Sequence, residues 1–341
     1  MRRLACLSAV LMALGLAGAC GGAADQATPE ATSTATATAM SPSPSKASQS
    51  SPVPRLLFES GFEDGVTLSE PTLRFGQWRQ TLRGADRGYD WASALAGTPA
   101  DFQFMVSGQD AKDAASLGRF VETRIEEVVG PVGMRTRALY QALRARGTMG
   151  ATQNDFIIFN MQDAQHGYVR YWVKLQPDLL DVMKDEFDWR VMLEWKEQPS
   201  FETPLDFQYR WLVMLSRSKA DGLVWKVEGD SVAPGQAATG SSWTDDWTLW
   251  NRDVPVPLGR WFLFEASWNL DSGEEGRLAV RVDGALIAER RGRTQLKSPQ
   301  GKLYLFEVYL GEGPLRRGFA YQWVDDVELW SDVPAAYAPR R

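Results

Sequence analysis

An alternation of apolar and polar residues with a period of two runs through most of the chain after about residue 55. In the stretch that begins at Trp261, the residues Phe262, Phe264 and Trp268 fall on one side of an extended chain, and Glu265 falls on the other. Successive side chains of a strand point to opposite faces, so this pattern predicts a strand with one buried face. The same alternation recurs in many segments, which favours an all-β, antiparallel fold.

A hairpin is predicted shortly after this strand. Asp283-Gly284 separates two short apolar runs, and both central residues of a type I′ turn need a positive φ, which Asp-Gly tolerates well. A two-residue turn at this position predicts that Val280 lies opposite Ile287.

Three other segments combine an apolar face with a face that carries cations or aromatic rings. In residues 166–175 the second face bears Tyr168, Arg170, Trp172 and Lys174. In residues 188–197 it bears Arg190, Met192, Glu194 and Lys196. The third predicted strand, at residues 209–215, includes Arg210.

The stretch 254–294 carries a recognisable set of motifs: Pro-Leu-Gly-Arg-Trp, an alternating strand, Val-Asp-Gly, and Gly-Arg-Thr at its end. It resembles the concanavalin A-like jelly-roll domains of bacterial polysaccharide lyases, especially the heparin-lyase and glucuronan-lyase group, and laminin-G-like domains share part of the pattern. The resemblance implies an antiparallel β-sandwich. Residues 119–129 and 137–146 contain good helix formers, but the resemblance favours a strand for residues 137–145.

Acidic motifs bracket the domain, with Phe-Glu-Asp-Gly near its start and Val-Asp-Asp-Val-Glu-Leu near its end. In the carbohydrate-binding jelly rolls that these motifs resemble, the first and last strands lie side by side, and some hold a structural calcium there. Calcium takes about six to eight oxygen ligands. The candidate ligands are Glu63, Asp64, Asp325 and Asp326. The alternative is that these acids lie in solvated turns, and no other cofactor is expected.

The N-terminus has the features of an export signal. Arg2 and Arg3 precede a short apolar run, and small residues come before Cys20. This order resembles a bacterial lipoprotein signal over residues 1–19, with Cys20 as the lipidated residue, and an ordinary cleaved signal is the alternative. Residues 20–54 have few large apolar side chains, so we expect a disordered tether rich in Ser, Thr, Pro and Ala.

Residues 55–335 are expected to form one jelly-roll domain without a disulfide, because the only two cysteines are Cys6 and Cys20. The formal net charge of −6 disfavours a nucleic-acid partner. We therefore expect a monomer in the bacterial cell envelope that binds no nucleic acid and contacts the membrane only through its lipid anchor.

A polysaccharide is the expected partner. Sugar rings need flat aromatic surfaces and fixed polar groups, and uronic acids or sulfates also need Arg or Lys. If the strands at 168–174 and 190–196 are neighbours with the same polarity of face, their cations form a patch for an acidic polysaccharide. The candidate ligand-binding residues are Trp172, Lys174, Arg190, Glu194, Lys196, Arg210, Trp243 and Trp247. The alternative is an outward face whose basic stems cover apolar surface.

The second candidate function is a polysaccharide lyase that cleaves a uronate-containing glycan by β-elimination. The resemblance implies a His or Tyr base, a Tyr acid and a polar group against the uronate carboxylate. His166 is the only histidine of the chain, so the candidate catalytic residues are His166, Tyr168 and Arg170. Gln165 and His166 are adjacent, so the Gln-x-His motif of one alginate-lyase group is absent. The third candidate is a structural envelope protein without a ligand.

Overall fold

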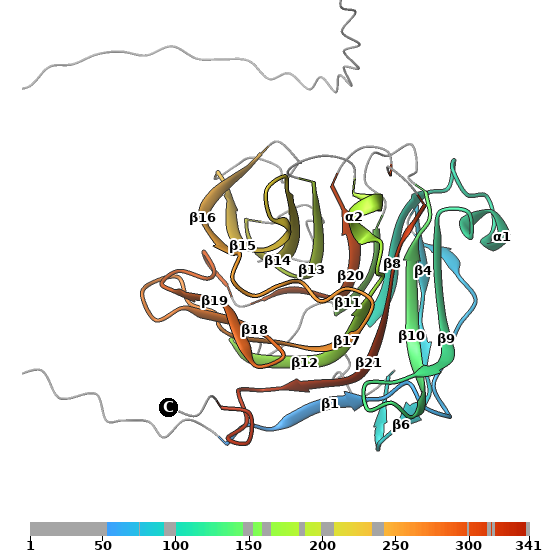
Figure 1. Cartoon of the computed structure of the whole chain (residues 1–341), viewed down its shortest axis with the longest axis horizontal. Coiled ribbons are helices and arrows are strands. Elements are labelled where there is room, and N and C mark those ends of the chain that lie inside the picture. The colour runs from blue at the N-terminus through green and yellow to red at the C-terminus, as the bar shows by residue number, and fades with distance from the viewer. Residues whose placement is uncertain are drawn as a thin grey trace, which may run out of the picture. The chain divides into compact units, whose positions relative to one another are not determined.

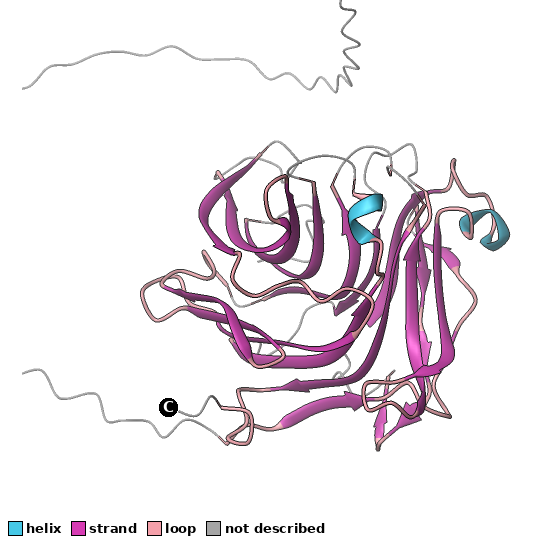
Figure 2. Ribbon diagram, viewed as in Figure 1, coloured by secondary structure: helices cyan, strands magenta, loops and turns pink. Residues whose placement is uncertain are grey.

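The computed structural model describes residues 53–74, 76–91, 100–145, 153–158, 165–183, 188–198, 208–233, 242–298, 300–311, 315 and 318–338. The predicted signal, Cys20 and the predicted tether up to residue 52 lie outside the described residues. The described part is dominated by strands, with two short helices, α1 (Ala114–Leu117) and α2 (Leu179–Val182) (Figure 2). No helix in the described ranges is long and apolar enough to cross a membrane.

One of the two main sheets has eight strands. They are β1 (Leu56–Ser60), β9 (Val121–Val129), β10 (Arg135–Leu143), β12 (His166–Leu175), β17 (Trp261–Asn269), β18 (Arg277–Val282), β19 (Ala285–Arg291) and β21 (Ala320–Trp330). Their order is β19-β18-β17-β12-β21-β10-β9, and β1 pairs with β21. The first and last strands are therefore neighbours, as predicted, with Ser60 opposite Val327.

The other main sheet has nine strands in the order β16-β15-β14-β13-β20-β11-β8-β4-β3. They are β3 (Thr72–Arg74), β4 (Gln77–Gln80), β8 (Ala100–Ser107), β11 (Gln153–Ile158), β13 (Trp189–Glu197), β14 (Tyr209–Ser218), β15 (Gly222–Val232), β16 (Trp243–Asn251) and β20 (Gly301–Leu310). Two small pairs complete the fold: β2 (Thr67–Leu68) with β5 (Leu82–Arg83), and β6 (Ala85–Asp86) with β7 (Tyr89–Asp90).

The core lies between the two sheets. Tyr171 of the eight-stranded sheet meets the ring of Phe306 of the nine-stranded sheet at a centroid distance of 5.0 Å, and Trp211 meets Trp268 at 5.9 Å. Most of the largest fully buried side chains are aromatic, among them Trp195, Trp211 and Trp225. The protein is thus an antiparallel β-sandwich of the jelly-roll class, as the sequence predicted.

Each main sheet also has an outer face that points away from this core. Figure 1 shows strands β13 to β16 bending so that their hollow side is turned away from the eight-stranded sheet. Side chains that alternate with the core residues of these strands therefore gather on a hollow surface. We call it the outer face of the nine-stranded sheet.

Several local predictions meet the structure closely. Phe262, Phe264 and Trp268 are buried on the core side of β17. Asp283 and Gly284 have φ values of 49° and 79°, as a type I′ turn requires. The predicted pairing across this hairpin is wrong, however, because a bulge shifts the register and puts Ala288 opposite Val280.

Helix propensity fails in residues 119–129, where the structure has β9. Each residue from Val121 to Val129 pairs with a residue of β10, so the ladder of hydrogen bonds outweighs the intrinsic preference of this segment. The strand favoured by the resemblance for residues 137–145 corresponds to β10.

The strands at 168–174 and 190–196 are not neighbours. The prediction of a single cationic patch formed by both strands is therefore wrong. β12 belongs to the eight-stranded sheet, where it lies between β17 and β21. β13 belongs to the nine-stranded sheet, where it lies between β14 and β20. The polar faces of the two strands point outward from opposite sides of the sandwich, so their cations form two separate surfaces.

Candidate functional site

Charged and aromatic side chains gather on the outer face of the nine-stranded sheet. Their strands supply apolar residues to the core at the alternate positions, so the polar positions are directed to the other side. The members of this group are Asp155 on β11, Glu194 and Lys196 on β13, Arg210 on β14, Lys226, Glu228 and Asp230 on β15, Trp243 and Trp250 on β16, and Lys302, Tyr304, Glu307 and Tyr309 on β20.

The register of four strands arranges part of this group in a line. Arg210 lies opposite Asp230 on one side and opposite Lys196 on the other, and Lys196 lies opposite Lys302. Three cations are thus direct cross-strand neighbours, an arrangement that repulsion disfavours unless anions compensate for it.

Two buried carboxylates provide this compensation. Glu194 receives Lys196 Nζ at 2.8 Å and Arg210 Nη1 at 3.4 Å. Asp230 receives Arg210 Nη2 at 2.7 Å. Glu194 lies two residues before Lys196 in β13, so both side chains are on the same face. This single carboxylate therefore neutralises cations of two strands.

The cation is the accessible partner in each of these ion pairs. The side chain of Lys196 is 15% exposed and that of Arg210 is 20% exposed, whereas that of Glu194 is 0% exposed. Lys226 and Glu228 repeat this relationship, with 19% and 9% exposed. Long basic stems allow the charged ends to reach water while the carboxylates remain below. A ligand that approaches this face therefore meets cations first.

Aromatic rings are interleaved with these cations. The guanidinium carbon of Arg210 lies 4.3 Å from the ring centre of Trp243, and Lys196 Nζ lies 4.5 Å from that of Tyr304. Trp189 and Tyr309 meet edge to face at 4.7 Å beside them. These are the residue types that bind both the charges and the apolar faces of sugar rings.

Several groups on this face have strongly perturbed proton affinities. Burial, together with repulsion from Lys196 and Arg79, lowers the pKa of Lys302 to about 8. Burial raises the pKa of Tyr304, an effect that Lys196 opposes. Burial also raises the pKa of Glu307, and repulsion from Asp155 and Glu194 adds to it. Such clusters of shifted pKa values are typical of functional sites.

Sequence reasoning missed Lys302, Tyr304 and Tyr309, although their strand carries a usable signal. Leu303 and Leu305 alternate with the first two of them. The pattern then breaks at Phe306, which has a φ of 55° and turns into the core, so a simple alternation assigns the rest of β20 to the wrong faces.

Arg190 does not belong to the outer face, contrary to the prediction. A bulge between Val191 and Leu193 reverses the alternation in the middle of β13. Arg190 is therefore directed into the sandwich, where its Nη2 donates a hydrogen bond to Gln322 Oε1 at 2.6 Å. Burial lowers the pKa of this guanidinium to about 9. Its position is that of a core residue.

Trp243 and Trp247 both lie in β16, but on different faces. Trp247 packs against the core, its indole lies directly over Gly229, and its Nε1 donates to the hydroxyl of Tyr209 at 2.8 Å. Trp243 is the partner of Arg210 on the outer face. The two rings therefore do not form one platform.

The predicted catalytic residues lie on the outer face of the eight-stranded sheet. Tyr168 is buried and its hydroxyl donates to Glu265 Oε1 at 2.5 Å, while His166 is exposed at the start of β12. The guanidinium of Arg170 lies 4.1 Å from the ring centre of Tyr337. The structure brings these three residues onto one face, away from Lys196 and Arg210. Trp172 and Lys174 continue the same face, with Lys174 Nζ 5.4 Å from the ring centre of Trp323.

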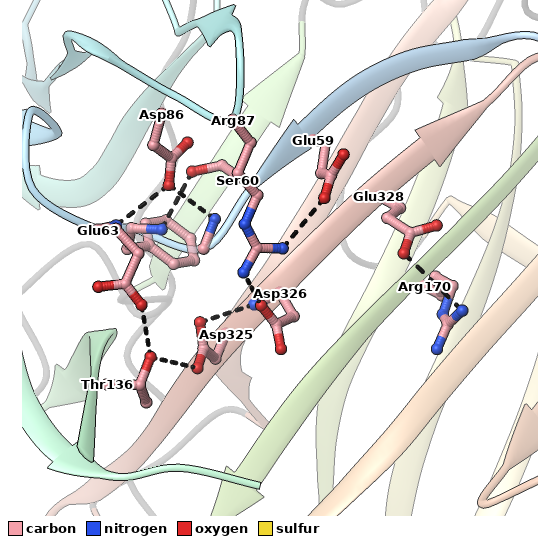
Figure 3. A network of polar contacts seen from close by, with 12 residues as sticks. Glu59, Ser60, Glu63, Asp86, Arg87, Thr136, Arg170, Asp325, Asp326 and Glu328 are labelled. Atoms are coloured by element: carbon pink, nitrogen blue, oxygen red, sulfur yellow. Dashed lines mark hydrogen bonds and ion pairs between the residues drawn. The ribbon is translucent and has the colours of Figure 1, made fainter. Parts of the chain in front are cut away.

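Two of the four predicted calcium ligands meet at one hydroxyl (Figure 3). Thr136 Oγ1 lies 2.7 Å from Glu63 Oε1 and 3.2 Å from Asp325 Oδ2. Because a hydroxyl has one proton, it cannot donate to both carboxylates at once. Burial and repulsion from Asp326 raise the pKa of Asp325 to about 7.

The other two predicted ligands are held by arginines. Asp326 accepts from Arg87, and Asp64, whose side chain is fully exposed, pairs with Arg137 at 3.1 Å. The four carboxylates therefore do not converge on one point. In the described ranges, one group of three carboxylates does lie close together, Glu228, Asp230 and Asp245, but Lys226 and Arg210 already neutralise two of them.

Solved structures similar to this chain include polysaccharide lyases and a carbohydrate recognition domain. An endo-β-1,4-glucuronan lyase from the fungus Trichoderma reesei is 14% identical, with a TM-score of 0.45 over 61% of this chain and 87% of that chain. The PL-14 alginate lyase from Aplysia kurodai is 8% identical, with a TM-score of 0.45 over 81% and 98%. The carbohydrate recognition domain of Emp47p is 7% identical, with a TM-score of 0.37 over 62% and 89%.

No family model matches the chain, and no curated protein matches it. At these identities and TM-scores the structural likeness assigns no activity, so the functional argument depends on the residues of the site.

Proposed function

We propose that this protein binds an acidic polysaccharide on the outer face of the nine-stranded sheet. The observation that carries the proposal is the layering of charge on this face, where Lys196 and Arg210 are accessible above the buried Glu194. The chain as a whole is acidic, so this local arrangement opposes the net charge and selects where an anionic ligand docks.

The chemistry of the face matches that of a uronate or sulfated glycan. Guanidinium and ammonium groups bind carboxylates and sulfates through charge-assisted hydrogen bonds. Trp243, Trp250 and Tyr309 supply rings for the C–H faces of the sugars, and Trp250 is 42% exposed. Cations and rings alternate over several strands, which suits an extended chain better than a single sugar.

A polysaccharide lyase is the second candidate, and the pKa of Lys302 favours it. A lysine with a pKa of about 8 is partly neutral near physiological pH and is able to act as a general base. It would take the proton beside the uronate carboxylate while Lys196 and Arg210 neutralise that carboxylate. The electron pair of that C–H bond forms a carbon–carbon double bond, and the bond from the neighbouring carbon to the glycosidic oxygen breaks. Tyr304 gives its proton to this leaving oxygen.

One experiment separates these candidates. The purified domain is incubated with a panel of uronate-containing polysaccharides, and both retention and ultraviolet absorbance are measured, because β-elimination leaves an absorbing unsaturated uronide. The binding proposal predicts retention without a rise in absorbance. The lyase candidate predicts a rise that Lys302→Met and Tyr304→Phe abolish and His166→Ala leaves unchanged. If the polysaccharides are neither retained nor cleaved, the result would favour a structural envelope protein without a ligand.

The proposed location is the bacterial cell envelope. Its support is the order of the N-terminal segments, in which an apolar signal ends just before Cys20 and a stretch rich in small and polar residues follows. A lipid on Cys20 would hold the polysaccharide-binding domain close to the membrane surface.

A further inference from the structure

A hollow of about 650 Å³ lies on the outer face of the eight-stranded sheet, which the proposed function does not use. It extends over β12, β17, β18 and β19, and the segment after β21 forms one of its walls. Its volume falls within the range of small-molecule sites, roughly 300 to 1,000 Å³.

The strand register explains why the surface is hollow here. Tyr168, Ser267, Ala279 and Glu289 are successive cross-strand partners. The two middle residues are small, while Tyr168 and Glu289 at the ends are large. Neighbouring strands lie about 4.8 Å apart, so the two small residues leave a floor that is wide enough for a sugar ring.

Polar groups border this floor on both sides. On one side Arg170, Glu265 and Arg281 are successive partners across three strands, so that cation, anion and cation alternate. On the other side His166 lies opposite Asn269, which in turn lies opposite Arg277. Each border therefore offers hydrogen-bond donors and acceptors, as a group of sugar hydroxyls requires.

Asn269 provides an observation that points to a ligand. Its Nδ2 donates to the backbone oxygen of Glu275 at 2.7 Å, but its buried Oδ1 has no hydrogen-bond partner among the described residues. A buried acceptor without a partner costs about 1–3 kcal/mol. Asn269 lines the hollow, so a turn of its side chain toward a ligand hydroxyl there would satisfy this oxygen.

Each end of the hollow also offers some apolar surface. Leu286 is 40% exposed at one rim and offers an apolar surface there. At the other end Tyr337 packs on Tyr168, with ring centres 5.9 Å apart. Such surfaces suit the C–H faces of a sugar.

The charges of the lining select against an anionic ligand. Four carboxylates line the hollow, those of Glu265, Glu275, Glu289 and Asp332. Arg277 and Arg281 are the two arginines of the lining. An acidic sugar would therefore meet more carboxylates than cations here, whereas on the outer face of the nine-stranded sheet the accessible partners of the ion pairs are the cations.

We propose that this hollow is a second binding site, which takes a short uncharged saccharide. The site is separate from the acidic-polysaccharide face, so both can be occupied together. Tyr168 and Tyr337 stack on the sugar, and Ser267 and Ala279 leave space for it. The Oδ1 of Asn269 accepts a hydrogen bond from it.

The test places a large side chain on the floor of the hollow and measures saccharide binding. The purified domain is titrated calorimetrically with uncharged di- to tetrasaccharides of glucose, galactose, mannose and N-acetylglucosamine, and with uronate and glucosamine oligosaccharides of the same length. Ala279→Trp should weaken binding of the uncharged ligand at least about tenfold. The matched control is Ala285→Trp, on the neighbouring strand and outside the lining, which should bind as the parent does.

Leu286→Ser is a second variant in case the filled variant fails to fold, and it should weaken binding severalfold because it removes the apolar rim. The proposal is overturned if no uncharged saccharide binds, if Ala279→Trp and Leu286→Ser bind it as tightly as the parent, or if the charged oligosaccharides alone occupy the hollow. None of these results depends on Lys196 or Arg210, so they leave the acidic-polysaccharide proposal standing.

Discussion

Lys196 and Lys302 lie directly opposite each other on adjacent strands, with both ammonium groups on the outer face of the nine-stranded sheet. Like charges in this position repel. Glu194 offsets the charge of Lys196, whereas burial and Lys196 itself make protonation of Lys302 less favourable. The pair therefore creates an ammonium group that titrates close to physiological pH.

Affinity for acidic polysaccharide should fall as the pH rises from about 7 to about 9. Lys302 is protonated below its pKa of about 8 and neutral above it, so an anionic ligand loses one favourable charge in this window. The measurement is the dissociation constant of a uronate oligosaccharide as a function of pH. Lys302→Arg should keep the affinity constant, and Lys302→Met should remove this pH dependence and bind weakly throughout.

Unfolding does not explain such a loss. The folded pKa of Lys302 is below its ordinary value of 10.5, so its deprotonation favours the folded state as the pH rises through this range. A wild-type affinity that is flat between the two pH values would contradict the assignment of Lys302 to the ligand face.

Arg190→Met should leave polysaccharide binding unchanged and raise the free energy of unfolding by about 1 kcal/mol. The guanidinium is fully buried, and its lowered pKa indicates that burial disfavours its charge. Methionine fills similar space without a charge, although Gln322 loses one donor. Chemical denaturation measures the change. A loss of binding in a folded variant would return Arg190 to the ligand site.

Asp325→Asn should flatten the pH dependence of stability between about pH 4 and about pH 7. The folded pKa of Asp325 is about 7, above its ordinary value of 3.8, so the folded state holds the proton more tightly. Its contribution to stability is present at low pH and is lost as the pH rises through this window. Thermal unfolding at several pH values measures the effect, with the exposed Asp64→Asn as the control.

Cys20→Ser should release the protein from the membrane fraction of a cell that processes lipoproteins. The sulfur atom of Cys20 would carry the lipid. Serine has a side chain of similar size but lacks this sulfur. Fractionation followed by detection of the domain measures the outcome. A variant that remains in the membrane fraction as fully as the parent would contradict the lipid anchor.

The faces of single strands could be predicted from the sequence, because burial of one face imposes a period of two. Val169, Tyr171 and Val173 alternate with Arg170 and are all buried. The same rule fails where a bulge adds a residue, as it does beside Arg190 and at Phe306. Nothing in the local pattern distinguishes a bulge from a continuous strand.

The assembly of the candidate site could not be predicted from the sequence, because it depends on which sheet each strand enters. β12 and β13 are close in the sequence and have similar polar faces, but they lie in opposite sheets. Lys196 instead gains its neighbours from β14 and β20, and β20 begins about a hundred residues later. Such long-range pairing follows from the whole topology and not from any one segment.

The measurement that tests the central claim most directly compares two net-neutral double variants for binding of a uronate polysaccharide across a range of salt concentrations. Glu194→Gln with Lys196→Met removes an ion pair from the outer face of the nine-stranded sheet, and Arg170→Met with Glu328→Gln removes one from the opposite face. Removing both members of a pair avoids leaving a buried charge alone.

The account predicts that the first variant weakens binding at least about tenfold and reduces its salt dependence, since an accessible cation is lost while the net charge stays the same. The second variant should bind as the parent does. Equal binding by all three proteins, or a loss confined to the second variant, would contradict the claim that the nine-stranded sheet holds the ligand.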